Sequence, residues 1–201
     1  MKKILFGLLL GLFALTFTTV TAANNYWMNE TYAVGSSNFY ETECISTHIG
    51  FLVQDGWYRD ESGRKVISSA SVNYTRYDFC QGIPLLNANG SVPISKLTFH
   101  TYGNLAAATL NTTIPVVDTL TNQSQTLVVR MNWIANGPQE RTRNNYHSHD
   151  GGILLISHSV SIIQPATLVG SIVAKGKNLI AGQAVTGDMG RGSEIHISIG
   201  H

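Results

Sequence analysis

Residues 127–133 read Leu-Val-Val-Arg-Met-Asn-Trp, and their large apolar side chains stand two positions apart at Leu127, Val129, Met131 and Trp133. Successive side chains of a β-strand point to opposite faces of the sheet, so this two-residue period is typical of a strand with one buried face. We predict a β-strand here whose apolar face belongs to the protein core.

The same period recurs on both sides of this segment. The other strands of this kind carry Val66, Ala70, Val72 and Tyr74; Leu97 and Phe99; and Ile195, Ile197 and Ile199. Residues 153–163 are more continuously apolar and β-branched, which predicts a central strand covered on both faces. Two shorter strands are expected over residues 168–174 and 179–185, separated by Gly176 and Lys177 as in a hairpin.

Turn-forming residues separate these runs at residues 60–63, 87–90, 136–138, 151–152 and 187–192. No segment shows a sustained helical period with a cap at each end. Many short strands between turns predict an all-β fold, an antiparallel β-sandwich of the immunoglobulin-like or jelly-roll-like kind, with a small β-barrel as the alternative. We expect residues 23–201 to form a single domain, and two β subdomains meeting at residues 87–93 are the less economical arrangement.

The N-terminus has the organisation of an export signal. Lys2 and Lys3 precede the apolar run of residues 4–17, and small residues follow at the positions that a signal peptidase reads. The pattern predicts a signal peptide over residues 1–22, cleaved before Ala23. No second long apolar run follows, so we do not expect a transmembrane helix. We therefore expect a secreted protein, periplasmic or on the cell surface, and the short Met-Lys-Lys start is typical of bacteria.

Cys44 and Cys80 are the two cysteines of the chain. In an oxidising compartment, two cysteines at this separation are expected to form a disulfide rather than a metal or catalytic site. The bridge would tie the first strand of the mature domain to the end of a later one.

The charge balance limits the classes of partner. Lys plus Arg number 13 and Asp plus Glu number 12, so the formal net charge is +1. A nucleic-acid-binding protein needs a basic field to displace counterions from phosphates, and that class is therefore excluded. Other proteins, glycans and self-association are the partners that this composition leaves open.

Residues 135–152 are unusually rich in charged and histidine side chains for this chain, and we expect a loop here. His147 and His149 would share one face of an extended chain, with Asp150 next to them and His158 on the following strand. Imidazole and carboxylate groups in this arrangement are ligands for zinc or copper. The pattern lacks the further ligands of metallo-β-lactamases, cupins and copper–zinc superoxide dismutase, so a solvated turn is the competing interpretation.

Four residues are candidates for ligand binding. Arg141 and Arg143 lie in the same charged segment, and Trp57 and Tyr58 are adjacent aromatic residues near a predicted turn. No serine lies in a Gly-x-Ser-x-Gly elbow, and no catalytic residue is assigned. No cofactor other than zinc or copper is expected.

Two short segments resemble known sequences. Residues 77–82 (Tyr-Asp-Phe-Cys-Gln-Gly) and 129–133 (Val-Arg-Met-Asn-Trp), the latter followed by Gly137 and Arg141, are similar to segments of uncharacterised exported bacterial all-β proteins. The similarity covers residues 66–149. It implies an exported β-protein and assigns no activity.

The leading hypothesis is a secreted non-enzymatic β-sandwich protein that serves as a surface, adhesive or matrix binding or structural module. The alternative is a metal-binding protein or metal-dependent enzyme that uses residues 135–152. A small outer-membrane barrel fits the strand number, but the absence of aromatic girdles and of a terminal aromatic residue argues against it, as does the cysteine pair.

Overall fold

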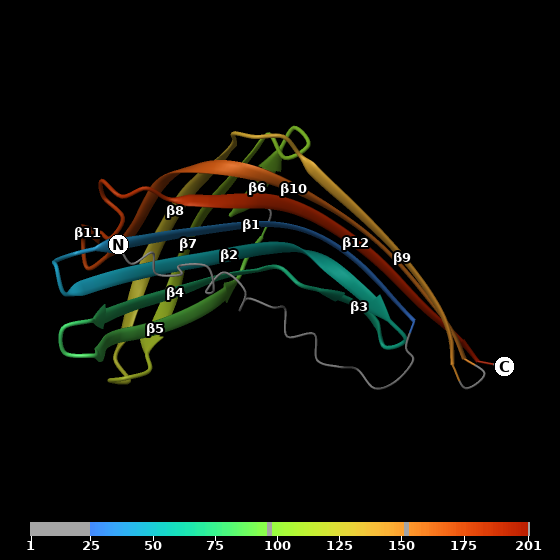
Figure 1. The fold of residues 1–201 in the computed structure, drawn as a ribbon, viewed down its shortest axis with the longest axis horizontal. Helices are drawn as coiled ribbons and strands as arrows, with labels where there is room; N and C mark the ends of the chain where they lie inside the picture. Colours follow the sequence, from blue (N-terminus) through green and yellow to red (C-terminus); the bar gives the residue numbers. More distant parts are fainter. Residues whose placement is uncertain (1–24, 96–97, 151–152, 201) are drawn as a thin grey trace, which may run out of the picture.

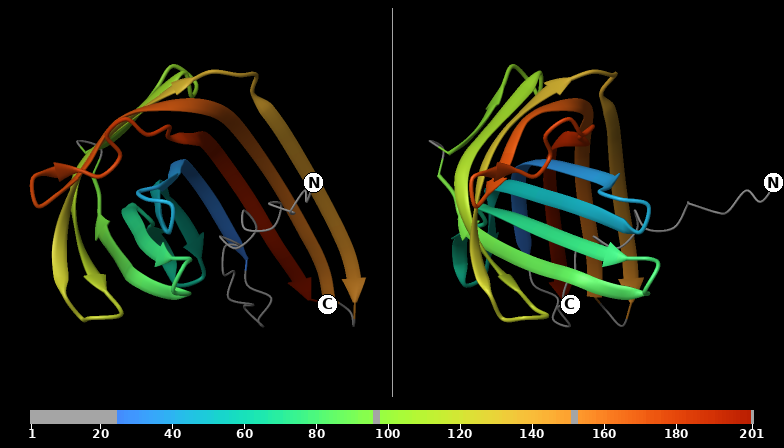
Figure 2. Two further views of the ribbon diagram at one scale, coloured as in Figure 1. Left: turned by 60° about the vertical axis from the view of Figure 1, so that its left-hand side comes forward. Right: turned by 90° about the vertical axis from the view of Figure 1, so that its left-hand side faces the viewer.

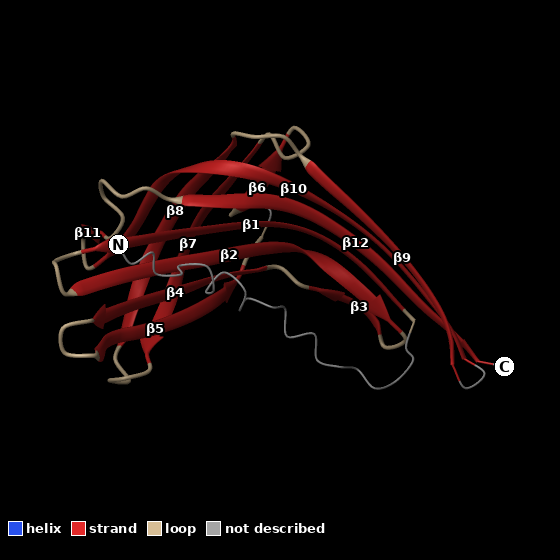
Figure 3. Ribbon diagram, viewed as in Figure 1, coloured by secondary structure: helices blue, strands red, loops and turns tan. Residues whose placement is uncertain are grey.

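The computed structural model describes residues 25–95, 98–150 and 153–200, and these ranges consist of β-strands joined by turns and loops (Figures 1 and 3). The strands are β1 (Tyr26–Tyr40), β2 (Ile45–Asp60), β3 (Gly63–Val66), β4 (Ser69–Asp78), β5 (Ile83–Pro93), β6 (Phe99–Tyr102), β7 (Ala107–Asp118), β8 (Ser124–Ala135), β9 (Glu140–Asp150), β10 (Ile153–Ala174), β11 (Lys177–Asn178) and β12 (Thr186–Gly200). The predicted signal peptide, residues 1–22, lies outside the described residues. Nowhere in the described ranges is there a helix of the length and hydropathy that crossing a membrane requires.

The strands form one antiparallel sheet that closes on itself. Hydrogen-bonded neighbours follow the order β1-β12-β10-β8-β7-β5-β4-β2, and β2 also pairs with β1. The predicted antiparallel all-β fold is confirmed. The closed ring is barrel-like (Figure 2). Side chains from opposite walls fill its interior as they do between the layers of a sandwich.

The strand predicted from residues 127–133 is β8, and its apolar side chains are buried as expected. Leu127, Val129 and Trp133 are fully buried, and Met131 is 1% exposed. The Trp133 indole crosses the interior, where its Nε1–H donates a hydrogen bond to the carbonyl oxygen of Val34 at 2.8 Å. Because β8 and β1 are not neighbours in the sheet, this bond joins opposite walls of the ring.

Gly35 provides the space for this contact. A Cβ atom at this position would lie 2.4 Å from both Leu168 Cδ2 and Phe51 Cζ, closer than packed carbon atoms approach. The Phe51 ring meets the Trp133 ring edge to face, with centroids 5.7 Å apart. The absent side chain therefore lets large residues of β2, β8 and β10 meet at one point of the core.

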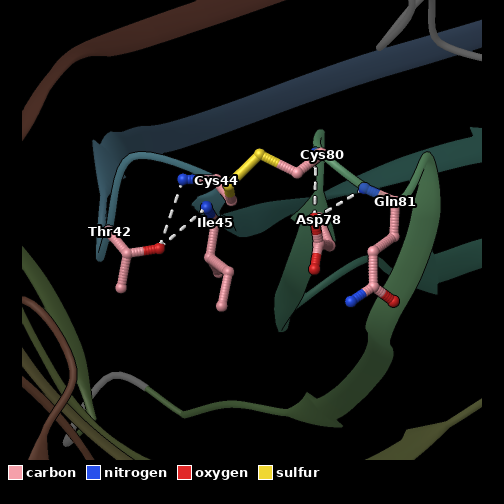
Figure 4. Close-up of a disulfide and its surroundings, with 6 residues drawn as sticks. All are labelled: Thr42, Cys44, Ile45, Asp78, Cys80 and Gln81. Atoms are coloured by element: carbon pink, nitrogen blue, oxygen red, sulfur yellow. Dashed lines mark hydrogen bonds between the residues drawn. A yellow bond between two sulfur atoms is a disulfide. The ribbon is translucent and has the colours of Figure 1, made fainter.

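The predicted disulfide between Cys44 and Cys80 is present, and their Cα atoms lie 5.2 Å apart (Figure 4). It joins the residue before β2 to a residue just after β4, at one end of the pairing between these strands. The Thr42 hydroxyl accepts a hydrogen bond from the Cys44 amide at 3.3 Å, and an Asp78 carboxylate oxygen accepts one from the Cys80 amide at 2.9 Å. Local hydrogen bonds thus order both ends of the bridge.

Four strands, β1, β2, β10 and β12, continue past the ring, and β3 and β9 flank them in a single layer that we call the sheet extension (Figure 1). Two long strands change partner where it begins: β2 passes from β4 to β3, and β10 passes from β8 to β9. In spatial order the extension comprises residues 63–66 of β3, 54–60 of β2, 26–31 of β1, 191–200 of β12, 153–163 of β10 and 140–150 of β9.

The predictions for one loop and one strand are wrong. The expected loop over residues 135–152 instead contains β9 at residues 140–150, which pairs with β10. Because β9 is an edge strand, polar on both faces, it lacks the apolar alternation that indicates a strand. The expected strand over residues 179–185 is turn and loop, with Ile180 and Val185 buried against the core.

The prediction for residues 153–163 is half right. The segment is central in the sheet, between β9 and β12, but it is not covered on both faces, and Ile153 is 38% exposed. Val66 ends β3 and is 74% exposed rather than buried. Both residues belong to the extension. Val66 is on the side that faces the core within the ring and is exposed because the second wall ends, whereas Ile153 is on the opposite side of the sheet.

Two turns expected because of their glycines are parts of strands instead. Gly90 lies in β5 and Gly187 in β12, so residues 87–90 and 187–192 are not turns. A Cβ atom would lie 2.0 Å from the carbonyl oxygen of Pro115 at Gly90, and at the same distance from that of Val34 at Gly187. These glycines allow close approach of a neighbouring backbone, which is a second use of glycine within strands. The expected turn at residues 151–152 lies outside the described residues.

The disulfide yields a prediction about stability. It closes a loop with a sequence separation of 36 residues, and the chain-entropy relation assigns such a loop about 4 kcal/mol of stabilisation. Replacing both Cys44 and Cys80 by Ser should lower the free energy of unfolding in urea by about this amount. Reduced wild-type protein is the control and should show the same loss, whereas an unchanged urea midpoint in both samples would contradict the prediction.

Candidate binding surface

The two faces of the sheet extension follow from the strand registers. Ala33 and Met189 oppose each other in the ring and are fully buried. Side chains an even number of positions from them along β1 and β12 share that face, which we call the inner face. The opposite side is the outer face. Paired residues of antiparallel strands lie on one face, so the registers assign the inner and outer residues of all six strands.

The centre of the inner face is apolar and exposed. An aliphatic stripe runs along β12 and β10, formed by Ile195, Ile197, Ile199, Leu154 and Ile156. Trp27 of β1 lies directly opposite Ile195. Trp27 is 39% exposed, Ile195 38% and Ile199 43%. Exposed apolar side chains that stand together in this way are characteristic of interaction sites.

Five arginines of the inner face lie around the end of the aliphatic stripe that is nearest the ring, level with residues 191–195 of β12. They are Arg59 of β2, Arg64 of β3, Arg191 of β12, and Arg141 and Arg143 of β9. All five are exposed. Among the residues that the structure describes, none of them forms an ion pair.

Two of the arginines lie against tryptophan rings. The Arg59 guanidinium carbon is 6.0 Å from the centre of the Trp27 ring, and that of Arg64 is 4.6 Å from the Trp57 ring. Cation–π contacts of this kind restrict the arginines without neutralising their charge. The β2 and β3 side of the surface therefore presents aromatic rings with ordered cations above them.

The outer face has the opposite charge. Its carboxylates within the extension are Glu30, Asp60, Glu140 and Glu194, and Asp188 lies on the same side of the sheet just inside the ring. Burial raises the pKa of Glu30, against a smaller lowering effect of the hydrogen bond from Gln54. Burial also raises the pKa of Asp188. On the inner face of the extension, the one described carboxylate is Asp55, which accepts a hydrogen bond from the Ser68 hydroxyl at 2.5 Å.

A small cleft lies at the base of the inner face, where the extension joins the ring. Its volume is about 220 Å³, and Thr31, Asp55, Phe99, His100 and Thr101 line it. It therefore places β6 next to β1 and β2. The cleft is polar and small, whereas the arginine-lined stripe is the larger feature of the same face.

The structure places the candidate ligand-binding residues on different faces. Trp57, Arg141 and Arg143 belong to the inner face, with Trp57 near one edge and the two arginines at the other. Tyr58 belongs to the outer face, where the Lys65 ammonium lies 5.2 Å from its ring. Trp57 and Tyr58 therefore do not form one aromatic surface, because neighbouring residues of a strand point in opposite directions.

The candidate metal ligands share a face but do not converge. His147, His149 and His158 all have inner-face parity, and the His158 ring is hydrogen-bonded to Asn145. Asp150 is the last residue of β9, and its side chain lies outside the described part of the structure. Zinc or copper binding by these residues stays a prediction.

The tightest clustering of possible metal ligands lies elsewhere. For the described residues, Cys44, Asp78 and Cys80 form the one group of three possible ligands whose atoms lie within 4.8 Å of one another. The sulfur atoms of this group are joined in the disulfide. The group is therefore a structural bridge and not a metal site.

The sequence pattern alone does not identify the arginine-lined surface. The alternation of Ile195, Ile197 and Ile199 is that of a core strand, and the structure shows instead that it is the exposed continuation of one. Arg59, Arg64 and Arg191 are far apart in the sequence. The sequence signal that could have indicated the surface lies in β12. At every second residue from Arg191 to Ile199 the side chain is apolar or basic, except Ser193, and the acidic residues of this strand occupy the alternate positions.

No model of a known protein family matches the sequence, and no curated protein is detectably similar to it. Among solved structures, a candidate AttH protein from Nitrosomonas europaea is similar, with 15% sequence identity and a TM-score of 0.34. The match covers 83% of this chain and 51% of that protein, so the chain spans about half of its length. Similarity at this level carries no conclusion about fold or function.

Burial of Glu30 predicts a pH-dependent effect. Its pKa is raised in the folded protein above the ordinary value of 4.5. Ionisation of Glu30 therefore lowers the stability of the fold as the pH rises from the pKa of the unfolded chain past the higher pKa of the folded protein. Glu30→Gln should therefore raise the free energy of unfolding at pH 7. The gain should disappear below pH 4.5, where the carboxyl is protonated in both states. Urea titrations at pH 4 and pH 7 measure it, with the exposed Glu43→Gln as control, and an equal effect of Glu30→Gln at both pH values would contradict the assignment.

Proposed function

We propose that the protein is a secreted, non-enzymatic binding module of the periplasm or cell surface, and that the inner face of its sheet extension is the binding surface. One observation carries this proposal. Ile195 and Ile199 of the aliphatic stripe, together with Trp27, stand exposed on a face that, within the ring, forms the core.

The energetics favour an occupant for this face. Fully burying a large apolar side chain contributes about 1.5–3 kcal/mol relative to leaving it exposed. Ile195, Ile199 and Trp27 are each more than one third exposed, so a partner would gain part of this energy at three sites. The free energy of binding is most favourable when the partner also forms ion pairs with the arginines of this face.

The chemistry of the surface is that of binding. Arginines, tryptophans and aliphatic side chains supply contact area and charge. Asp55, the described carboxylate of this face, is held by the Ser68 hydroxyl at the rim of the cleft. The disulfide supports export, because such bonds persist in oxidising compartments.

A photo-crosslinking residue placed at Ile195 tests this function in the producing cell. Ile134 is the matched control, because it is an exposed isoleucine on the outside of the ring, 52% exposed. We expect a discrete crosslinked product from position 195 and none from position 134, detected by immunoblotting of the exported protein. Absence of a product at position 195, or equal products at both positions, would remove the basis for the proposal.

A further inference from the structure

Charge on the sheet extension is divided between its faces. The inner face carries five of the seven arginines of the chain and no lysine, and the outer face carries four carboxylates. The near-neutral total charge of the protein conceals this division. A ligand for the inner face must therefore supply negative charge as well as apolar surface.

The choice of arginine indicates the class of partner. Protein–protein interfaces are enriched in arginine and tryptophan and depleted in lysine, glutamate and aspartate. The inner face has this composition, with Trp27 and Trp57 beside the five arginines. Guanidinium groups match carboxylates with two parallel hydrogen bonds, which the lysine ammonium does not do.

The arrangement of these groups indicates the shape of the partner. The aliphatic stripe occupies the two central strands β12 and β10. Arg59 and Arg64 lie on one side, level with Ile195, and Arg141 and Arg143 lie on the other side, level with residues 191 and 193 of β12. Six strands span about 24 Å, and residues 191–199 of β12 extend about 27 Å. An α-helix about 10 Å in diameter covers the central strands and leaves Arg59, Arg64, Arg141 and Arg143 at its flanks, and about 18 residues of helix match the length.

A second copy of this chain fits the surface poorly. Two inner faces brought together would oppose five arginines to five arginines, which is repulsive. The outer face of another copy has the right charge, but several of its acids are already engaged. Asp60 is paired with Lys65 at 3.4 Å, and Glu194 accepts a hydrogen bond from Tyr26.

We infer that the inner face of the sheet extension receives an amphipathic α-helix of another protein, with an apolar side on the aliphatic stripe and carboxylates on both flanks of the end nearest the ring. This inference rests on the proposed function and specifies its partner. Apolar burial provides the affinity, and the arginines on the two sides fix the helix on the stripe.

Two synthetic peptides of about 18 residues test the inference. Both carry leucines on one helical face, and the flanking positions hold glutamate in the first peptide and lysine in the second. Isothermal titration of the disulfide-bonded exported protein should show the glutamate peptide binding at least about tenfold more tightly. Vesicles of phosphatidylglycerol are a third probe and should bind more weakly than the glutamate peptide.

Substitutions locate the binding on the protein. Arg143→Gln and Ile197→Ser should each weaken binding of the glutamate peptide by about tenfold. Arg130→Gln is the matched control, because Arg130 is exposed on β8 outside the extension, and it should leave binding unchanged. Circular dichroism and the urea midpoint of each variant confirm that the fold is retained.

Several outcomes would overturn the inference. These are equal binding of the two peptides, no binding of either, preferential binding to the vesicles, or an equal effect of Arg130→Gln and Arg143→Gln. If the crosslink at Ile195 forms while the glutamate peptide fails, the surface binds a partner of different chemistry. If both fail, the proposed function is wrong as well.

Discussion

Four long strands, β1, β2, β10 and β12, run from the ring into the sheet extension. In each of them the alternate side chains that face the interior of the ring continue on the inner face of the extension. The pairings of β1 with β2, β1 with β12 and β10 with β12 run without a register shift along their whole lengths. A shift of one residue would exchange the two faces beyond it. Residues that continue the core pattern are therefore held on the inner face even where no opposite wall covers them. The apolar stripe is a direct consequence of this register.

Periodicity predicts the parts of the fold in which local sequence and burial agree. Residues 127–133 show this, because their alternation gives both the strand and its buried face. The disulfide is predictable because the chain has one pair of cysteines and the features of an exported protein. The closure of the sheet is not predictable in this way, since it depends on pairing between β1 and β2 and between β5 and β7, which no local pattern specifies.

The candidate surface shows a second limit of sequence reasoning. Arg141 and Arg143 attract attention because they lie in a charged segment, but Arg59, Arg64 and Arg191 meet them only through strand pairing. Alternation marks Ile195 as apolar on one face, yet whether that face is covered depends on how far the opposite wall extends. β9 escapes prediction because polar residues occupy both of its faces, so neither period appears.

The polar character of β9 has a consequence for the behaviour of the protein at high concentration. In the described structure β9 pairs on one side alone, with β10, which leaves a row of backbone donors and acceptors open along its other edge. Such an edge is a template for adding further chains strand by strand, and charged side chains are a common defence against it. Arg141 and Arg143 would stack like charges between copies joined in register. Like charges along this edge oppose its pairing with the same edge of another copy.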